Sequence, residues 1–150
     1  MSTAKKMDVT GLLGYKLKKT QHALRLHMDE VLRKLNLTTP QYSVLAQLEL
    51  ERGMSNAELA RRSFITAQTM HGIVSNLEQR KLIMRKNDPG HGRILCAELT
   101  SQGLQIVQKA HHLIRNIEEQ MTATVHQGDK QLLDQLLSEC LFNLNNLTKE

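Results

Sequence analysis

Tryptophan is absent from this 150-residue chain, which contains only two tyrosines and two phenylalanines. A core must therefore consist mainly of leucine, isoleucine, valine, methionine and alanine, a mixture that favours helices. Cysteine is also scarce, because Cys96 and Cys140 are the only two and lie far apart without a CxxC spacing. We interpret them as small hydrophobic residues of a reducing compartment, with a redox switch as the alternative.

Long apolar runs are missing as well. No segment approaches membrane-spanning length, and residues 1–19 lack the continuous apolar stretch and the small-residue cleavage site of a secretion signal. The length of the chain suits one domain, residues 1–150, with a core of its own. We therefore expect a cytoplasmic protein with no membrane partner.

Enzyme motifs are lacking too. No two of the seven histidines are separated by three or four residues, so no helix presents a ready pair of metal ligands. Neither a glycine-rich phosphate loop nor a nucleophile motif is present. We therefore expect no catalytic activity, no metal and no cofactor.

Positive charge, by contrast, is concentrated in the first two thirds of the chain. Residues 1–100 contain 16 Lys and Arg against 9 Asp and Glu, which is +7, and residues 101–150 contain 4 against 6, which is −2; together they give the net charge of +5. A polyanionic partner is therefore expected to meet the first two thirds.

Two helices are predicted in the first third. Apolar residues between Val9 and Leu35 recur at steps of three, four or seven, which indicates one amphipathic helix. Thr38 can cap a second helix, because Pro40 falls in its first turn and Gln41 follows three residues after the cap. We expect this second helix to end at Gly53.

Two short helices separated by a tight turn are predicted next. Ser55 and Glu58 have the spacing of a capping box for a helix that runs through Arg62, and Thr66 can cap the following helix. That helix has an apolar face of Met70, Ile73, Val74 and Leu77. Its opposite face carries no carboxylate and consists of Gln68, His71, Gly72, Ser75 and Gln79.

After Leu82 the apolar period shortens to two. Two such runs flank a loop rich in Asp, Pro and Gly, which predicts a β-hairpin. In its second strand we expect Leu95, Ala97 and Leu99 to face the core and Cys96 to point the other way.

Two long helices complete the chain. Thr100 can cap the first of them, and Gly128 with Asp129 opens the second. The last helix carries more leucine than one shallow packing surface needs.

A capped short helix, a tight turn, a second helix with an acid-free polar face and then a basic hairpin have the order of a winged helix-turn-helix. The second helix of such a unit enters the major groove, and the hairpin is a wing that brings cations to the DNA backbone or the minor groove. We therefore predict a mainly α fold with a short β-hairpin, in which a winged helix-turn-helix is flanked by dimerisation helices. The DNA-binding lobe is expected at about 54–100, and the dimerisation helices at about 8–36 and 101–148.

The segments LTTPQYSVLAQL, MSNAELARRSFITAQTMHGIVSNLEQRKLI, RKNDPGHGR and ILCAELTSQG follow one another in this order. In this ordered set the sequence resembles the MarR family of bacterial transcription regulators. The resemblance implies a repressor that is a homodimer of triangular outline, built from the first and the last two helices. Such proteins bind palindromic operators in double-stranded DNA and often release them when a small molecule or an oxidant acts.

The predicted DNA-binding residues lie in the two short helices and the hairpin. They are Ser55, Thr66, Gln68, Thr69, His71, Gly72, Ser75, Asn76, Arg80, Arg85, Lys86 and Arg93. The family commonly has an Asp-Arg-Arg run in the wing, where this chain reads His91-Gly92-Arg93, and often a basic residue where this chain has Gly72. We expect Asp88 to brace Arg93 in place of the family's carboxylate.

A small-molecule effector is implied by the resemblance alone, since family members often hold aromatic acids between the dimer helices and the DNA-binding lobe. The residues expected to line such a site are His22, Arg25, Tyr42 and His111. The alternative to a DNA-binding regulator is a winged-helix protein-interaction module, because a fold does not fix a function. The acid-free helix face and the basic hairpin favour DNA.

Overall fold

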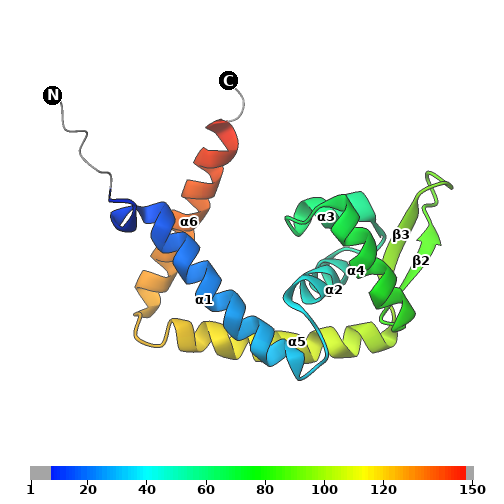
Figure 1. The fold of residues 1–150 in the computed structure, drawn as a ribbon, viewed down its shortest axis with the longest axis horizontal. Helices are drawn as coiled ribbons and strands as arrows, with labels where there is room; N and C mark the ends of the chain where they lie inside the picture. Colours follow the sequence, from blue (N-terminus) through cyan, green and yellow to red (C-terminus); the bar gives the residue numbers. More distant parts are fainter. Residues whose placement is uncertain (1–7, 148–150) are drawn as a thin grey trace. The chain divides into compact units, whose positions relative to one another are not determined.

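The computed structural model describes residues 8–147, and the chain forms two compact units, Met1–Ile117 and Glu118–Glu150. The fold is mainly helical with a small antiparallel sheet, as the sequence predicts (Figure 1). The elements in chain order are η1 (Val9–Gly11), α1 (Leu13–Arg33), α2 (Thr39–Leu50), β1 (Met54–Ser55), α3 (Asn56–Arg62), α4 (Ala67–Gln79), β2 (Ile83–Asn87), β3 (Leu95–Leu99), α5 (Ser101–Met121) and α6 (Gln127–Leu147).

The predicted helix starts are confirmed by their hydrogen bonds. Thr38 and Gln41 form a reciprocal capping box at the start of α2, and Ser55 and Glu58 form another at the start of α3. The Thr66 hydroxyl accepts the Thr69 backbone N–H at 3.2 Å and so caps α4. These short side chains satisfy backbone donors that a helix leaves without an internal partner, and their positions fix where the helices begin.

The end of α2 differs from the prediction. The helix ends at Leu50, because the backbone at Glu51 is already extended. Gly53 instead lies in the turn into β1, with φ +77° and its N–H donating to the Ala97 carbonyl oxygen at 3.1 Å. The glycine therefore permits a sharp turn into the sheet and does not cap the helix.

The sheet has the strand order β1-β3-β2, and the two-residue strand β1 is an addition to the predicted hairpin. Ala97 is buried and Leu99 packs against the core as expected, but the prediction for Leu95 is wrong, because this residue is 46% exposed. Cys96 lies outside the core cluster that contains Ala97, in agreement with the orientation expected for it, although it is only 8% exposed. Cys96 lies in the central strand between Ser55 of β1 and Lys86 of β2. Leu95 pairs with Asn87 at the far end of the hairpin, beyond the reach of β1.

The core of the first unit lies between the helices and the sheet. Gly103 shows how closely they approach, because a Cβ atom added there would lie 1.9 Å from the Leu82 carbonyl oxygen. The helices contribute Leu32 from α1, Val44, Leu45 and Leu48 from α2, Leu59 from α3, Met70, Val74 and Leu77 from α4, and Val107, Ala110 and Ile114 from α5.

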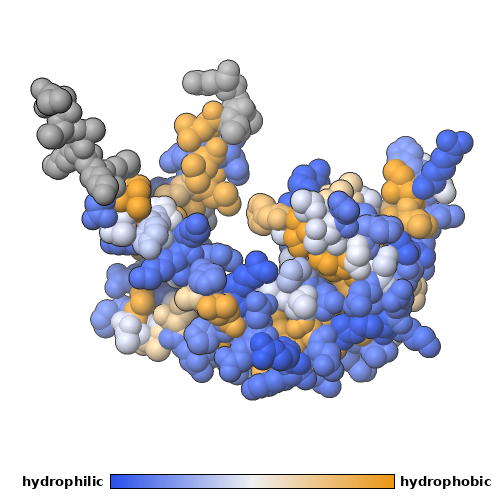
Figure 2. Space-filling view, in the orientation of Figure 1, coloured by the Kyte–Doolittle hydropathy of each residue, from blue (hydrophilic) through white to orange (hydrophobic). Residues whose placement is uncertain are grey.

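In the second unit, α6 exposes its apolar residues in the single chain. Figure 2 shows hydrophobic residues gathered along this helix. Their exposed fractions range from 42% to 72% for Leu132, Leu133, Leu136, Leu137, Leu141, Phe142, Leu144 and Leu147. The surplus of leucine that the sequence indicates is therefore present on the surface of α6.

Among the helices of residues 8–147, none has both the length and the apolar character that crossing a bilayer requires.

Candidate nucleic-acid interface

Helices α3 and α4 are joined by a turn closed by backbone hydrogen bonds. The Phe64 N–H donates to the Arg61 carbonyl oxygen at 3.4 Å, and the Ile65 N–H donates to the Ala60 carbonyl oxygen at 3.0 Å. Phe64 adopts φ +54°, and Thr66 then caps α4. The predicted helix-turn-helix is therefore present, with its turn at Ser63–Ile65 between the two helices.

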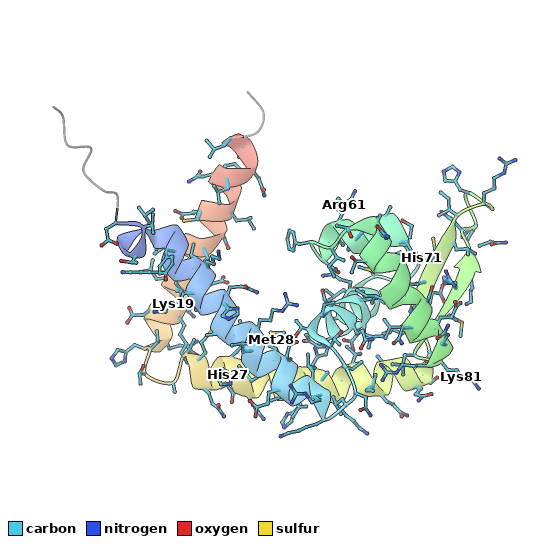
Figure 3. The ribbon with its side chains drawn as sticks, viewed as in Figure 1. Lys19, His27, Met28, Arg61, His71 and Lys81 are labelled. Carbon is cyan, nitrogen blue, oxygen red and sulfur yellow. The ribbon has the colours of Figure 1, made fainter. Side chains whose placement is uncertain are left out.

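Helix α4 separates its apolar and polar residues as predicted. Its apolar side packs into the core of the first unit, whereas the polar side is open to solvent. The exposed predicted DNA-binding residues of the turn and helix are Thr66, Gln68, Thr69, His71, Gly72 and Asn76, and Ser75 and Arg80 are half-buried. His71 is marked on α4 in Figure 3. The structure thus places a set of hydrogen-bonding side chains on one helix, where duplex bases would be reached from a single surface.

Some of the predicted DNA-binding groups already have partners within the chain. The Ser55 hydroxyl donates to Glu58 at 2.9 Å as part of its capping box. The Asn76 side-chain oxygen accepts from the Gln41 amide at 2.9 Å, which links α4 to the start of α2. These two residues therefore stabilise the helix-turn-helix in addition to any contact with DNA.

The strand β2 attaches to α4 through an ion pair that the sequence analysis did not anticipate. The Arg85 guanidinium donates to the Glu78 carboxylate through both Nε and a terminal nitrogen. The hydrogen bonds from Arg85 hold the pKa of Glu78 below its ordinary value, and Glu78 in turn raises the pKa of Arg85. Glu78 lies one helical turn beyond the buried Val74, so its position beside the hairpin follows only from the packing.

The other two predicted cations of the hairpin differ from each other. Lys86 pairs with Glu98 across the strands at 3.0 Å, whereas Arg93 is exposed and has no ion pair within residues 8–147. The expected brace from Asp88 is wrong, because the Asp88 carboxylate accepts the Gly90 N–H at 2.8 Å and closes the turn of the hairpin. Arg93 is therefore available to an anionic partner.

The residues expected to line an effector site are only partly brought together. The Tyr42 hydroxyl and His111 Nδ1 are 2.8 Å apart, and His111 Nε2 lies 2.6 Å from Glu49 Oε2. Arg25 instead forms an ion pair with Asp29 at 3.8 Å, and His22 is exposed on α1. The sequence analysis did not include Glu49 in this set. Its spacing of seven residues from Tyr42 nevertheless places both residues on one face of α2.

A separate cavity of about 610 Å³ contains none of the four expected effector residues. It is lined by Leu35, Gln105, Gln108, Lys109, His112 and Leu113. No group of three or more histidine, cysteine, aspartate or glutamate side chains suited to a metal ion is found from Asp8 to Leu147.

Comparison with known proteins identifies the family. The family model described as the MarR family matches residues 35–94. The HTH-type transcriptional repressor Rv2887 of Mycobacterium tuberculosis is 31% identical over 131 residues, which is 85% of this chain and 94% of the relative; its crystal structures name it a MarR family protein. The chain belongs to the MarR family.

Solved structures of MarR-family proteins share the fold of this member. The crystal structure of Rv2887 in complex with DNA has a TM-score of 0.74 and 26% identity, and covers 87% of this chain and 98% of that chain. The transcriptional repressor CouR bound to a 23-mer DNA duplex has a TM-score of 0.81 and 26% identity, and covers 93% and 99%. Rv2887 in complex with salicylic acid has a TM-score of 0.74 and 28% identity, and covers 89% and 99%.

Membership of the MarR family confirms the predicted class of protein, a transcriptional regulator that binds DNA through a winged helix-turn-helix. The family is one of transcription regulators. In this MarR-family chain, the polar face of α4 is exposed, and Arg93 is exposed and makes no ion pair among residues 8–147.

Proposed function

We propose that this chain is a homodimeric, ligand-responsive repressor that reads an inverted-repeat operator through α4 and anchors to the DNA backbone through the hairpin. The observation that carries this proposal is the set of exposed, carboxylate-free polar side chains from Thr66 to Asn76 on a helix whose other side is buried. A polar face without acidic residues accepts a polyanion without charge repulsion. Because the family is one of transcription regulators, we also propose a cytoplasmic, non-enzymatic role.

Within this proposal, Gln68 and His71 read bases and Arg93 contacts the backbone or the minor groove. Gln68 and His71 lie in the first half of α4, where a recognition helix meets base edges, and glutamine pairs with adenine in a bidentate manner. Arg85 and Lys86 are engaged by Glu78 and Glu98 and therefore act mainly by fixing the wing.

The homodimer is proposed from the exposed apolar residues of α6. A helix with this many exposed leucines would leave a monomer with a large apolar surface, which soluble monomers rarely have. We assign DNA binding to a lobe at about 54–100, and dimerisation to helices at about 8–36 and 101–148. Two copies related by a twofold axis would present two copies of α4, so half-site centres should lie about ten base pairs apart, which is one turn of DNA.

The effector is proposed to be an aromatic carboxylic acid near Tyr42 and His111. Rv2887 has been crystallised with salicylic acid and with p-aminosalicylic acid, and it is 27–28% identical to this chain in those comparisons. Tyr42 and His111 offer ring surfaces and hydrogen-bonding groups in one half-buried cluster.

Titrating salicylate into the DNA complex should release DNA. His111→Ala should weaken this response to salicylate and leave the affinity for DNA in the absence of ligand unchanged.

The decisive experiment selects duplexes from genomic DNA with the purified protein and tests them in an electrophoretic shift assay against random competitor. We expect retention of an inverted-repeat sequence at competitor excess that removes random duplexes. Absence of any DNA binding at low salt would overturn the proposal in favour of a protein-interaction module, because electrostatic attraction to DNA is strongest there.

A further inference from the structure

Phe64 is a bulky aromatic residue in a backbone conformation that suits glycine. Its φ of +54° lies in the left-handed region, and the turn after α3 requires this conformation. The two hydrogen bonds of the turn, from Phe64 to Arg61 and from Ile65 to Ala60, are those of a Schellman motif, whose left-handed position is usually glycine. A Cβ atom at that position costs free energy that glycine would not. The fold alone would therefore favour glycine at residue 64.

The side chain of Phe64 does not offset this cost through packing. It is 94% exposed, more than any other large hydrophobic side chain among residues 8–147. The next residue, Ile65, is the one from this turn that packs against the core. Strained backbone positions persist mainly where they serve a function, and here the strain coincides with an uncovered aromatic ring.

The surroundings of Phe64 favour an anionic partner with apolar parts. The segment from Leu59 to Leu77 contains no Asp or Glu, and Arg61, at the end of α3 in Figure 3, is exposed. Phe64 also stands two residues before Thr66, the cap of the recognition helix α4. Duplex DNA offers phosphates together with apolar deoxyribose rings and thymine methyl groups.

We propose that Phe64 is a DNA-contacting residue whose ring packs against deoxyribose and thymine methyl groups at the edge of the half-site read by α4. The contact rests on the proposed function of α4 and extends it from hydrogen-bond readout to an apolar contact made from the turn. The interaction removes apolar surface of both partners from water and involves no charge.

The test compares Phe64→Gly, Phe64→Leu and wild-type protein on a duplex that the wild type selects from genomic DNA. Phe64→Gly should raise the melting temperature by about 2–4 °C, because it relieves the left-handed strain. It should also weaken operator binding about tenfold, equivalent to 1.4 kcal/mol. The slope of log affinity against log salt should not change, since no cationic contact is lost. Phe64→Leu should retain part of the affinity.

Asn36→Gly is the matched control, because Asn36 follows α1 with a similar φ of +53° and lies outside the helix-turn-helix. It should leave operator binding unchanged. A Phe64→Gly protein with a lower melting temperature would show that the ring supports the fold, and one that became monomeric in light scattering would show that it contacts a second copy; either result overturns the proposal. Unchanged operator affinity of Phe64→Gly beside weakened binding by Gln68→Ala would overturn this contact alone. A wild-type protein that retains no duplex would overturn the proposed function as well.

Discussion

Glu78 determines which cations of the hairpin remain available to a partner. It takes Arg85 into a half-buried ion pair, so that the guanidinium orients β2 against α4. Lys86 is similarly engaged by Glu98, and only Arg93 of the three predicted cations extends without an ion pair in the described structure. A count of basic residues in the sequence therefore overstates the charge that the wing can offer to DNA.

Removal of the ion pair should destabilise the protein in a pH-dependent way. Glu78→Gln should lower the free energy of unfolding at pH 7 by about 1 kcal/mol. Because the pKa of Glu78 is lowered in the folded protein, its contribution is present above the ordinary value of 4.5 and is lost as the pH falls through the folded value. Urea denaturation of both proteins at pH 7 and at successively lower pH should show the two stabilities converging in acid. Glu98→Gln, which breaks a more exposed pair, is the control and should change stability less. A difference that persisted unchanged in strong acid would contradict this account.

Arg93→Ala should affect DNA binding and leave the fold intact. The side chain is exposed and makes no ion pair in the described residues, so the melting temperature should be nearly unchanged. Loss of one cationic contact should weaken binding and flatten the plot of log affinity against log salt by about one unit. Fluorescence anisotropy over a range of salt concentrations measures both quantities. Unaltered affinity and slope would mean that the wing does not contact DNA through Arg93.

Cys96 is a poor candidate for a redox switch. Its burial, and secondarily the negative charges of Asp88, Glu58 and Glu98, raises the pKa of its thiol. A protonated, buried thiol reacts slowly with oxidants, because the thiolate is the nucleophile. The structure thus supports the interpretation of Cys96 as a small hydrophobic residue.

At the scale of the elements, substitutions on the polar face of α4 should lower the affinity for the operator and leave the affinity for random DNA nearly unchanged. Gln68→Ala or His71→Ala should cost about 1–3 kcal/mol on the selected operator, because base contacts are lost there. Binding to random duplex should barely change, since that binding depends on the phosphates. Competition assays with both kinds of DNA measure the difference. Equal weakening on both would exclude base readout by this face.

The junction of α5 with the sheet gives a stability prediction. Gly103→Ala should destabilise the first unit by several kcal/mol or prevent folding, because the added methyl group would lie 1.9 Å from the Leu82 carbonyl oxygen. Circular dichroism during thermal denaturation tests this. Gly72→Ala, where a Cβ atom would meet nothing within 4 Å, is the matched control in α4 and should be stable.

Local signals predicted the elements well, and long-range packing accounts for what they missed. The caps Thr38, Ser55 and Thr66 act within three residues, so a sequence pattern is sufficient to find them. Strand β1 is two residues long and exists only through pairing with β3, so no periodicity could reveal it. The same pairing places Cys96 in the central strand, where it is buried although it lies outside the core cluster that contains Ala97.

The candidate site was predictable to a similar extent. Its polar helix face follows from the helical period of α4, which the sequence displays directly. The partners of the charged residues could not be predicted from the sequence. The pairs formed by Arg85 with Glu78 and by His111 with Glu49 each join two different elements. The Asp88 carboxylate accepts a hydrogen bond from the Gly90 N–H within its own turn. Charge complementarity alone had instead predicted an ion pair between Asp88 and Arg93.

At the scale of the whole molecule, the exposed leucines of α6 should determine the oligomeric state. The double variant Leu137→Asp, Leu144→Asp should be monomeric in light scattering, because two charges on the apolar surface would have to be buried in a dimer. Gln131→Asp with Gln135→Asp adds the same charge to polar positions of α6 and should remain dimeric. A folded, dimeric Leu137→Asp, Leu144→Asp protein would place the interface elsewhere.

The exposed apolar surface of α6 also has a consequence for regulation, because operator occupancy would depend on the concentration of the protein in the cell. For a dimer held together by this surface, the population able to occupy both half-sites is set by mass action between protomers. Where the monomer predominates, the dimer increases with the square of the total protomer concentration. Operator occupancy then falls more steeply than protein abundance, and dilution through cell growth would lift repression even without an effector.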